Sequence, residues 1–100
     1  MVANMEMNKT ERTKAWKEYS KSLRENGFCA VCGKDTNFNV HHILERKHYP
    51  QFMFEKKNLI LLCCGCHKLC RLSAHQNPVW FSRWLSDNRP AQYGWAIANL

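Results

Sequence analysis

Two pairs of cysteines constrain the fold of this 100-residue chain more than any other feature. Each pair, Cys29/Cys32 and Cys63/Cys66, has two residues between its cysteines. This spacing lets both sulfurs of a pair reach one ion, so four thiolates can surround a structural zinc ion as a tetrahedron. The segment between the pairs is longer than the roughly 15–20 residues of simple zinc ribbons. The expected zinc site therefore closes a loop that contains further structure.

The sequence favours a zinc site over disulfides as the cross-link that stabilises this chain. The first residues, MVANMEMNKT, lack the basic stretch and apolar run of a secretory signal, so we expect reduced cysteines and a cytoplasmic location. No apolar run approaches the ~20 residues that cross a bilayer, so no membrane partner is expected. A chain of this length buries little apolar surface and gains stability from a bound metal.

The chain holds two more cysteines, Cys64 and Cys70, which leave the ligand set ambiguous. Either could replace a member of the second pair. The repeated two-residue spacing favours Cys63 with Cys66, and the two others are then expected to be small buried side chains.

The charge of the chain favours a polyanionic partner. Fifteen Lys and Arg against eight Asp and Glu give +7. Four thiolates on one zinc contribute 4 × (−1) + 2 = −2, which leaves about +5. Such a surplus is typical of nucleic-acid binding. Many of the basic residues are equally expected on the solvated face of an N-terminal helix: Lys9, Arg12, Lys14, Lys17, Lys21 and Arg24.

The pattern before the first cysteine pair predicts an amphipathic helix over residues 9–26. Asn8 and Glu11 can form a capping box at its start, and Asn26-Gly27 is expected to end it in a left-handed conformation. Its apolar residues recur on one face and are expected to pack on the core: Trp16, Tyr19 and Leu23.

Residues 28–75 are expected to form the core of an α+β fold. Apolar alternation predicts a strand from about Phe38 to Ile43, and the run from Asn58 to Leu62 predicts a second strand. The segment 44–57 contains a proline and is expected to be a loop. A helix is expected to begin near His67.

Residues 77–100 are expected to form a helical tail. Asn77-Pro78 is an N-cap followed by a proline at the first helical position, and Pro90 is expected to begin a last short helix. The whole chain, 1–100, is therefore predicted to be one domain.

Four histidines in and near the predicted core suggest a second metal site. His41 and His42 end the first expected strand, where adjacent residues project to opposite faces. One can bind a metal while the other faces a different part of the site. His67 directly follows the last zinc cysteine, so zinc would also fix its position. His75 lies eight residues further on, and the fifth histidine, His48, is expected on a solvated loop.

The cysteines and histidines together resemble the HNH endonucleases. The resemblance is carried in order by Cys29-Ala-Val-Cys-Gly, Val40-His-His-Ile and Asn58-Leu-Ile-Leu-Leu-Cys-Cys-Gly-Cys-His67. It covers roughly residues 28–75 and implies a ββα-metal core of two strands and a helix. The tail from Ser73 to Phe81 is similar to that of small phage or prophage-encoded members.

The resemblance implies a role for each matching residue. His42 matches the general base that activates the attacking water, and His41 matches the metal ligand before it, where many members have aspartate. His67 matches the ligand on the helix. Asn58 matches an asparagine that braces the loop bearing the base.

The sequence does not decide which residue is the third ligand of the catalytic metal. His75 could supply it, but some relatives place this ligand four residues after the position of His67. This chain has Arg71 there.

The resemblance thus implies a metal-dependent DNA endonuclease with weak sequence preference on double-stranded DNA. Imidazole ligands favour Mn²⁺, Ni²⁺, Co²⁺ or Zn²⁺ over Mg²⁺. Phage packaging machinery is a partner that the resemblance suggests. Five basic residues near the expected site are predicted to contact backbone phosphates: Arg46, Lys47, Lys56, Lys57 and Arg71.

Two other classes of protein could use these cysteines. A treble-clef-like zinc module that binds nucleic acid or protein without cutting would account for the cysteines and the charge, but not for the clustered histidines. A thiol redox protein would place one C-x-x-C beside a βαβ pattern, which this sequence lacks.

Overall fold

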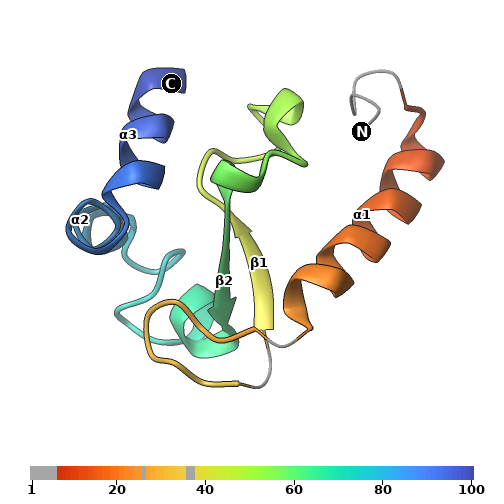
Figure 1. Ribbon diagram of the computed structural model, residues 1–100. Coiled ribbons are helices and arrows are strands. Elements are labelled where there is room, and N and C mark those ends of the chain that lie inside the picture. Colours follow the sequence, from red (N-terminus) through yellow and green to blue (C-terminus); the bar gives the residue numbers. More distant parts are fainter. Residues whose placement is uncertain (1–6, 26, 36–37) are drawn as a thin grey trace.

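A β-hairpin lies between an N-terminal helix and two C-terminal helices in the computed structural model, which describes residues 7–25, 27–35 and 38–100 (Figure 1). The α+β class expected from the sequence is confirmed. The elements are α1 (Lys9–Arg24), β1 (Phe38–His42), β2 (Leu59–Cys63), α2 (Pro78–Asn88) and α3 (Pro90–Asn99).

Helix α1 begins as the sequence predicts but ends differently. The Asn8 side chain accepts the N–H of Glu11 at 2.8 Å, which satisfies a backbone donor of the first turn. The helix ends at Arg24, and Asn26 lies outside the described residues. The expected left-handed stop at Asn26-Gly27 depends on Asn26 and therefore lies outside the described residues. A Cβ at Gly27 would meet Leu61 Cδ2, so Gly27 permits a close approach to β2.

Strands β1 and β2 pair antiparallel, with Phe38 opposite Cys63 and His42 opposite Leu59. Strand β1 ends one residue earlier than expected, and β2 is shifted by one residue toward the cysteines. The connection between them is the expected loop, with single 3-10 turns at Pro50–Phe52 and Lys56–Asn58. The hairpin therefore joins the second cysteine pair to the histidines at the end of β1.

The helix expected to begin near His67 begins two residues earlier, at Gly65. A single helical turn of π type covers Gly65–Leu69, and the backbone is extended again at Cys70. The turn begins inside the cysteine pair because the N–H of Cys66 points at the Cys63 sulfur, 3.5 Å away. His67 thus lies in the middle of this turn.

The C-terminal helices begin where the sequence predicts. Asn77 Oδ1 accepts the N–H of Trp80 at 3.1 Å, and prolines occupy the first positions of both α2 and α3. Phe81 and Leu85 of α2 pack in the core with Ile60 and Leu62 of β2. Within the described residues, no helix is long and apolar enough to span a membrane.

Candidate functional site

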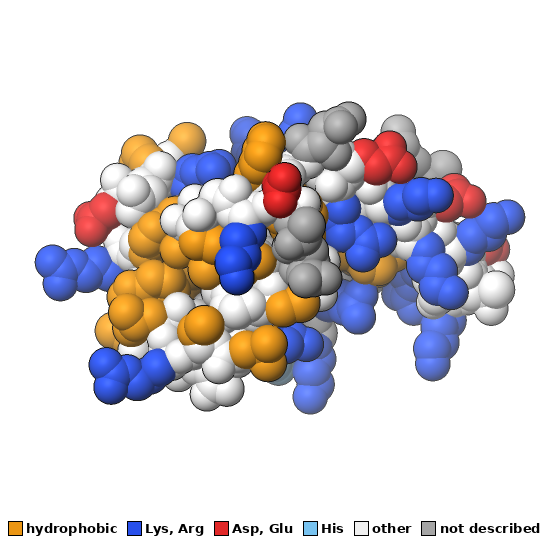
Figure 2. Space-filling model, turned by 90° about the horizontal axis from the view of Figure 1, so that it is seen from below, with side chains coloured by type: hydrophobic (Ala, Val, Ile, Leu, Met, Phe, Trp, Pro, Cys, Tyr) orange, Lys and Arg blue, Asp and Glu red, His pale blue; other side chains and the backbone are white. Residues whose placement is uncertain are grey.

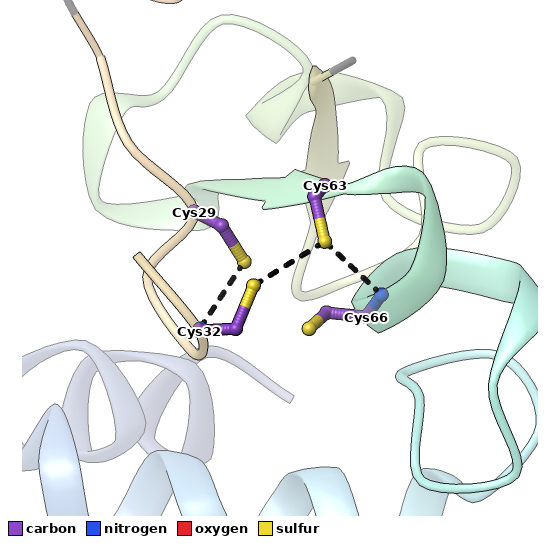
Figure 3. A group of neighbouring side chains, drawn as sticks. All are labelled: Cys29, Cys32, Cys63 and Cys66. Atoms are coloured by element: carbon purple, nitrogen blue, oxygen red, sulfur yellow. Dashed lines mark hydrogen bonds between the residues drawn. The ribbon is translucent and has the colours of Figure 1, made fainter. Parts of the chain in front are cut away.

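The four cysteines of the two pairs converge at one end of the hairpin (Figure 3). Their sulfurs all lie within 4.8 Å of one another, and those of Cys32 and Cys63 are 3.5 Å apart. Zinc–sulfur bonds of ~2.3 Å require sulfurs roughly 3.8 Å apart in a tetrahedron. The first sulfur of each pair also accepts a backbone N–H from the second cysteine, at 3.5 Å in both pairs. The donor set fits a structural zinc ion, as predicted.

The ionisation of these thiols also favours a cation. Burial and the neighbouring sulfurs raise the pKa of Cys66. Burial raises the pKa of Cys29 too, but backbone N–H donors outweigh it and lower that pKa to about 6. Four crowded thiols cannot all ionise without a cation to balance them.

Cys64 and Cys70 lie outside the four-sulfur cluster, as the spacing predicted. Cys64 is half-buried and accepts a hydrogen bond from Asn39 Nδ2 at 3.4 Å. Cys70 is exposed, so the expectation that it would be buried is wrong. The chain is already extended and leaving the helical turn at that residue.

Three histidines form a second cluster of metal-binding type. His41 of β1, His67 of the helical turn and His75 each offer a ring nitrogen, and these nitrogens lie within 4.8 Å of one another. The Nε2 atoms of His67 and His75 are 3.0 Å apart. Two nitrogens bound at ~2.0–2.1 Å to one metal would lie roughly 3–3.4 Å apart. The cluster therefore fits a divalent metal.

His75 reaches this cluster because the chain folds back after the helical turn. The backbone N–H of Ala74 bonds to the carbonyl of Cys66 at 2.8 Å, and that of His75 bonds to the carbonyl of His67 at 3.0 Å. These bonds set the two imidazoles side by side. Arg71 lies exposed on the returning segment and is not part of the cluster.

The surroundings of His41 and His67 favour their neutral imidazoles, which is the form that binds metals. Burial, followed by the neighbouring histidines, lowers the pKa of His41 to about 3. Burial, followed by His75 and Lys68, lowers the pKa of His67 to about 4. The other ring nitrogen of His67, Nδ1, is buried and has no hydrogen-bond partner among the described residues, so packing orients this ring. Phe81 packs on the other buried imidazole, with its ring perpendicular to that of His41 at a centroid distance of 5.2 Å.

His42 lies on the other face of β1 and has different neighbours. Its ring centroid is 4.7 Å from that of Trp16 in α1, and its Nε2 lies 3.0 Å from the carbonyl oxygen of Met53. A carbonyl only accepts hydrogen bonds, so Nε2 carries the hydrogen and Nδ1 keeps the lone pair. Burial lowers the pKa of His42, and Arg46 adds to this effect, although the Met53 bond opposes it.

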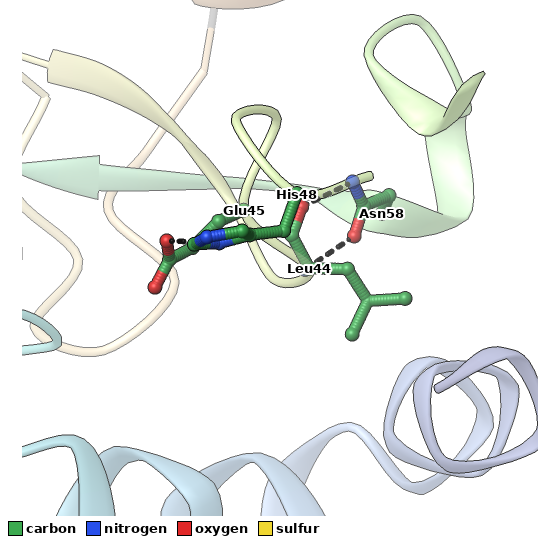
Figure 4. A network of polar contacts seen from close by, with 4 residues as sticks. All are labelled: Leu44, Glu45, His48 and Asn58. Carbon is green, nitrogen blue, oxygen red and sulfur yellow. Dashed lines mark hydrogen bonds and ion pairs between the residues drawn. The ribbon is translucent and has the colours of Figure 1, made fainter. Parts of the chain in front are cut away.

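Asn58 ties together the two ends of the loop that carries Met53 (Figure 4). Its side chain is fully buried; Oδ1 accepts the N–H of Leu44 at 2.7 Å, and Nδ2 donates to the Leu44 carbonyl at 3.1 Å. Nδ2 also lies 3.2 Å from the carbonyl of Phe52. The same figure shows His48 paired with Glu45 on the exposed side of the loop, as expected for a solvated histidine.

His41 and His42 both line one cleft, although their side chains lie on opposite faces of β1. This cavity of about 380 Å³ is lined by His41, His42 and His75 together with apolar residues of α2 and α3. A ligand in the cleft can therefore approach both the histidine cluster and the end of β1.

The five basic residues predicted to contact phosphates are all exposed but do not form one patch. Arg46 and Lys47 line a groove against α1, whereas Lys56 and Lys57 line another groove near Arg89. Arg71 lies apart from both, on the segment that returns to His75.

Sequence reasoning missed two neighbours of His42, Trp16 and the Met53 carbonyl. The helical spacing of Trp16 with Tyr19 did indicate that both face inward, but it could not identify the histidine that Trp16 covers. A backbone carbonyl leaves no signal in a sequence.

A zinc-stapled hairpin followed by a helical turn that presents imidazoles defines a metal-binding ββα domain. Residues 29–69 match the model of a family described as HNH endonuclease. This segment is therefore an HNH domain, and the resemblance read from the sequence is confirmed. No curated protein and no solved structure matches the chain.

Proposed function

We propose that the chain is a metal-dependent DNA endonuclease that hydrolyses phosphodiester bonds. The observation that carries this proposal is the cluster of His41, His67 and His75, with His42 as the next residue on the same strand and beside the same cleft. Nuclease-type function is typical of the HNH family.

Different residues of this chain have different roles in the proposed hydrolysis. A divalent metal, when bound by the three histidines, supplies positive charge for the scissile phosphate and the departing oxygen. His42 takes a proton from the attacking water at Nδ1, while the Met53 carbonyl holds the ring by the opposite nitrogen. Asn58 fixes the loop on which Met53 lies.

The three ligands are neutral imidazoles, so we propose Mn²⁺, Ni²⁺, Co²⁺ or Zn²⁺ as the active metal in preference to Mg²⁺. Cleavage rates at equal concentrations of each ion test this preference. Faster cleavage with Mg²⁺ than with Mn²⁺ and Ni²⁺ would contradict it.

Plasmid cleavage with matched histidine variants tests the reaction. His42→Ala should lower the rate of supercoiled plasmid cleavage by about 10²–10⁴-fold, the usual contribution of a general base, with zinc content and DNA binding unchanged. His48→Ala removes an exposed histidine of the following loop and should cleave like the wild type. Equal cleavage by wild type and His42→Ala would exclude His42 as the base.

The substrate we propose is duplex DNA with weak sequence preference, cut in the cytoplasm, and phage packaging machinery is a candidate partner. The rival is a zinc module that binds nucleic acid or protein without cutting. DNA binding by the wild type without cleavage under any of the metals would favour that rival.

A further inference from the structure

A second groove, on the other side of the hairpin from the histidine cluster, is lined by α1 and by the start of the loop after β1. We name it the α1 groove. It has a volume of about 460 Å³, and its lining includes Trp16 and Met53. Five of its lining residues are cationic and none is acidic: Lys9, Arg12, Lys17, Arg46 and Lys47.

Among the described residues, the cations of the α1 groove have no protein counter-ion. None of the five makes an ion pair within the part of the chain that the structure describes. Such a concentration of like charge is unfavourable unless an anion binds there. Figure 2 shows Lys and Arg side chains gathered over the side of the molecule that carries α1, with hydrophobic side chains gathered on the opposite side.

The α1 groove is continuous with the proposed general base. Two of its lining residues contact His42: the Trp16 ring packs against its imidazole, and the Met53 carbonyl accepts from its Nε2. A strand whose scissile phosphate lies at His42 would therefore pass directly over these cations.

The groove also has the length to hold several phosphates. Lys9 and Lys17 are eight residues apart on α1, which spans about 12 Å at 1.5 Å per residue. Phosphates of one B-form strand recur at roughly 3.4 Å along the helix axis and further apart along the strand itself. We propose that the α1 groove binds the phosphodiester backbone of DNA beside the scissile phosphate.

This inference rests on the proposed nuclease function, and it assigns DNA binding to α1. From the sequence alone, the basic residues of α1 are equally expected on the solvated face of a helix. It also divides the five basic residues that the sequence predicted to contact phosphates into two groups. Arg46 and Lys47 belong to the α1 groove, whereas Lys56, Lys57 and Arg71 lie elsewhere and should contribute less.

Two double variants on the same helix test the α1 groove. Arg12→Gln/Lys17→Gln removes two charges from the groove, and Lys21→Gln/Arg24→Gln removes the same two residue types from the other end of α1. Binding to a short labelled DNA duplex is measured without added divalent metal over a range of salt concentrations. Zinc content and circular dichroism confirm the fold of both variants.

The groove variant should flatten the dependence of log K on log salt by about 2, since each phosphate contact on duplex DNA contributes about 0.9. The control variant should keep the wild-type slope. Equal slopes for the two variants, or no DNA binding by the wild type, would overturn the α1 groove. A second arm with single-stranded DNA shows which form supplies the backbone that binds there.

Separate cleavage assays keep the two proposals apart. In one outcome, the wild type does not cut DNA while the groove variant alone has a flatter slope of log K against log salt. This result supports DNA binding by the α1 groove and contradicts the nuclease proposal. If the wild type cuts and the two variants bind alike, the nuclease proposal stands and the groove is wrong.

Discussion

His41 and His42 are neighbours in sequence but have unlike surroundings. His41 lies among two other histidines and Phe81, whereas His42 lies against Trp16 and the Met53 carbonyl. Alternation along a strand accounts for this difference without any other feature of the sequence. The same residue type can therefore serve as a metal ligand on one face and as a base on the other.

Substitution of Trp16 should separate these two roles. Trp16→Leu removes the ring that packs on His42, and we expect cleavage to fall by roughly tenfold or more, because small misplacements of a reacting group are costly. Binding of Mn²⁺ or Ni²⁺ should not change, since the histidine cluster lies on the other face. Trp80→Leu, a half-buried tryptophan of α2, is the control. Loss of metal binding in Trp16→Leu, measured by calorimetry, would contradict the division between the faces.

Asn58→Ala should destabilise the protein. The substitution leaves the N–H and carbonyl of Leu44 without their partners in a buried place, which costs about 1–3 kcal/mol. Asn88→Ala removes an exposed side chain that donates to the carbonyl of Trp84 on α2, and it should change the free energy of unfolding by less than about 0.5 kcal/mol. Urea unfolding at constant zinc compares them. Equal stability of the two variants would show that the Asn58 bonds do not brace the loop.

At the scale of elements, short connections position the site more than long helices do. The single turn at Gly65–Leu69 presents His67, and two backbone bonds return His75 to it. The long helix α1 has one buried residue, Ser20, and its aromatic rings contact His42 and Phe54. The geometry of the histidine cluster thus depends on the segment 63–75.

Two glycine substitutions should have opposite effects on stability. Gly27→Ala places a Cβ against Leu61 and 3.3 Å from the carbonyl of Leu23, and should destabilise by about 1 kcal/mol or more. Gly94→Ala lies inside α3 with no atom within 4 Å of the new Cβ, and should stabilise by about 0.5–1 kcal/mol because it restricts the unfolded chain. Thermal unfolding of both variants tests the prediction. A stabilised Gly27→Ala would mean that Leu61 can move aside without cost.

At the scale of the whole molecule, the cluster of four cysteines joins segments that are far apart in sequence. It links the turn at Cys29 to the end of β2, and both cysteines Cys29 and Cys63 belong to the hydrophobic core. Loss of zinc should therefore affect the core and not a surface loop alone.

Cysteine variants should show this dependence directly. Cys63→Ser should lose zinc and unfold the protein, since structural zinc contributes to folding itself. Cys64→Ser should keep one equivalent of zinc, because Cys64 lies outside the four-sulfur cluster. Metal analysis and circular dichroism of the purified variants measure both effects. Zinc loss in Cys64→Ser with retention in Cys63→Ser would reverse the assignment of the ligands.

Local signals allowed much of this fold to be predicted from the sequence. The cysteine spacing, the N-cap at Asn77 and the apolar run before Cys63 each depend on a few adjacent residues. The contribution of His75 could not be decided, because it depends on how the chain returns after Leu69. Likewise, no local pattern shows that Arg46 and Lys56 lie in different grooves. These features follow from tertiary contacts that single residues do not encode.

The placement of the proposed ligand and the proposed base on adjacent residues has a consequence for how this domain can change. One peptide unit sets the distance between their Cα atoms at ~3.8 Å, and thermal motion of the protein hardly changes this distance. An insertion in the 44–57 loop would leave that spacing intact. An insertion between His41 and His42 would turn one side chain to the opposite face, because side chains alternate along a strand. Covalent geometry thus keeps the proposed ligand and the proposed base at a fixed spacing while the loop after them is free to change in length.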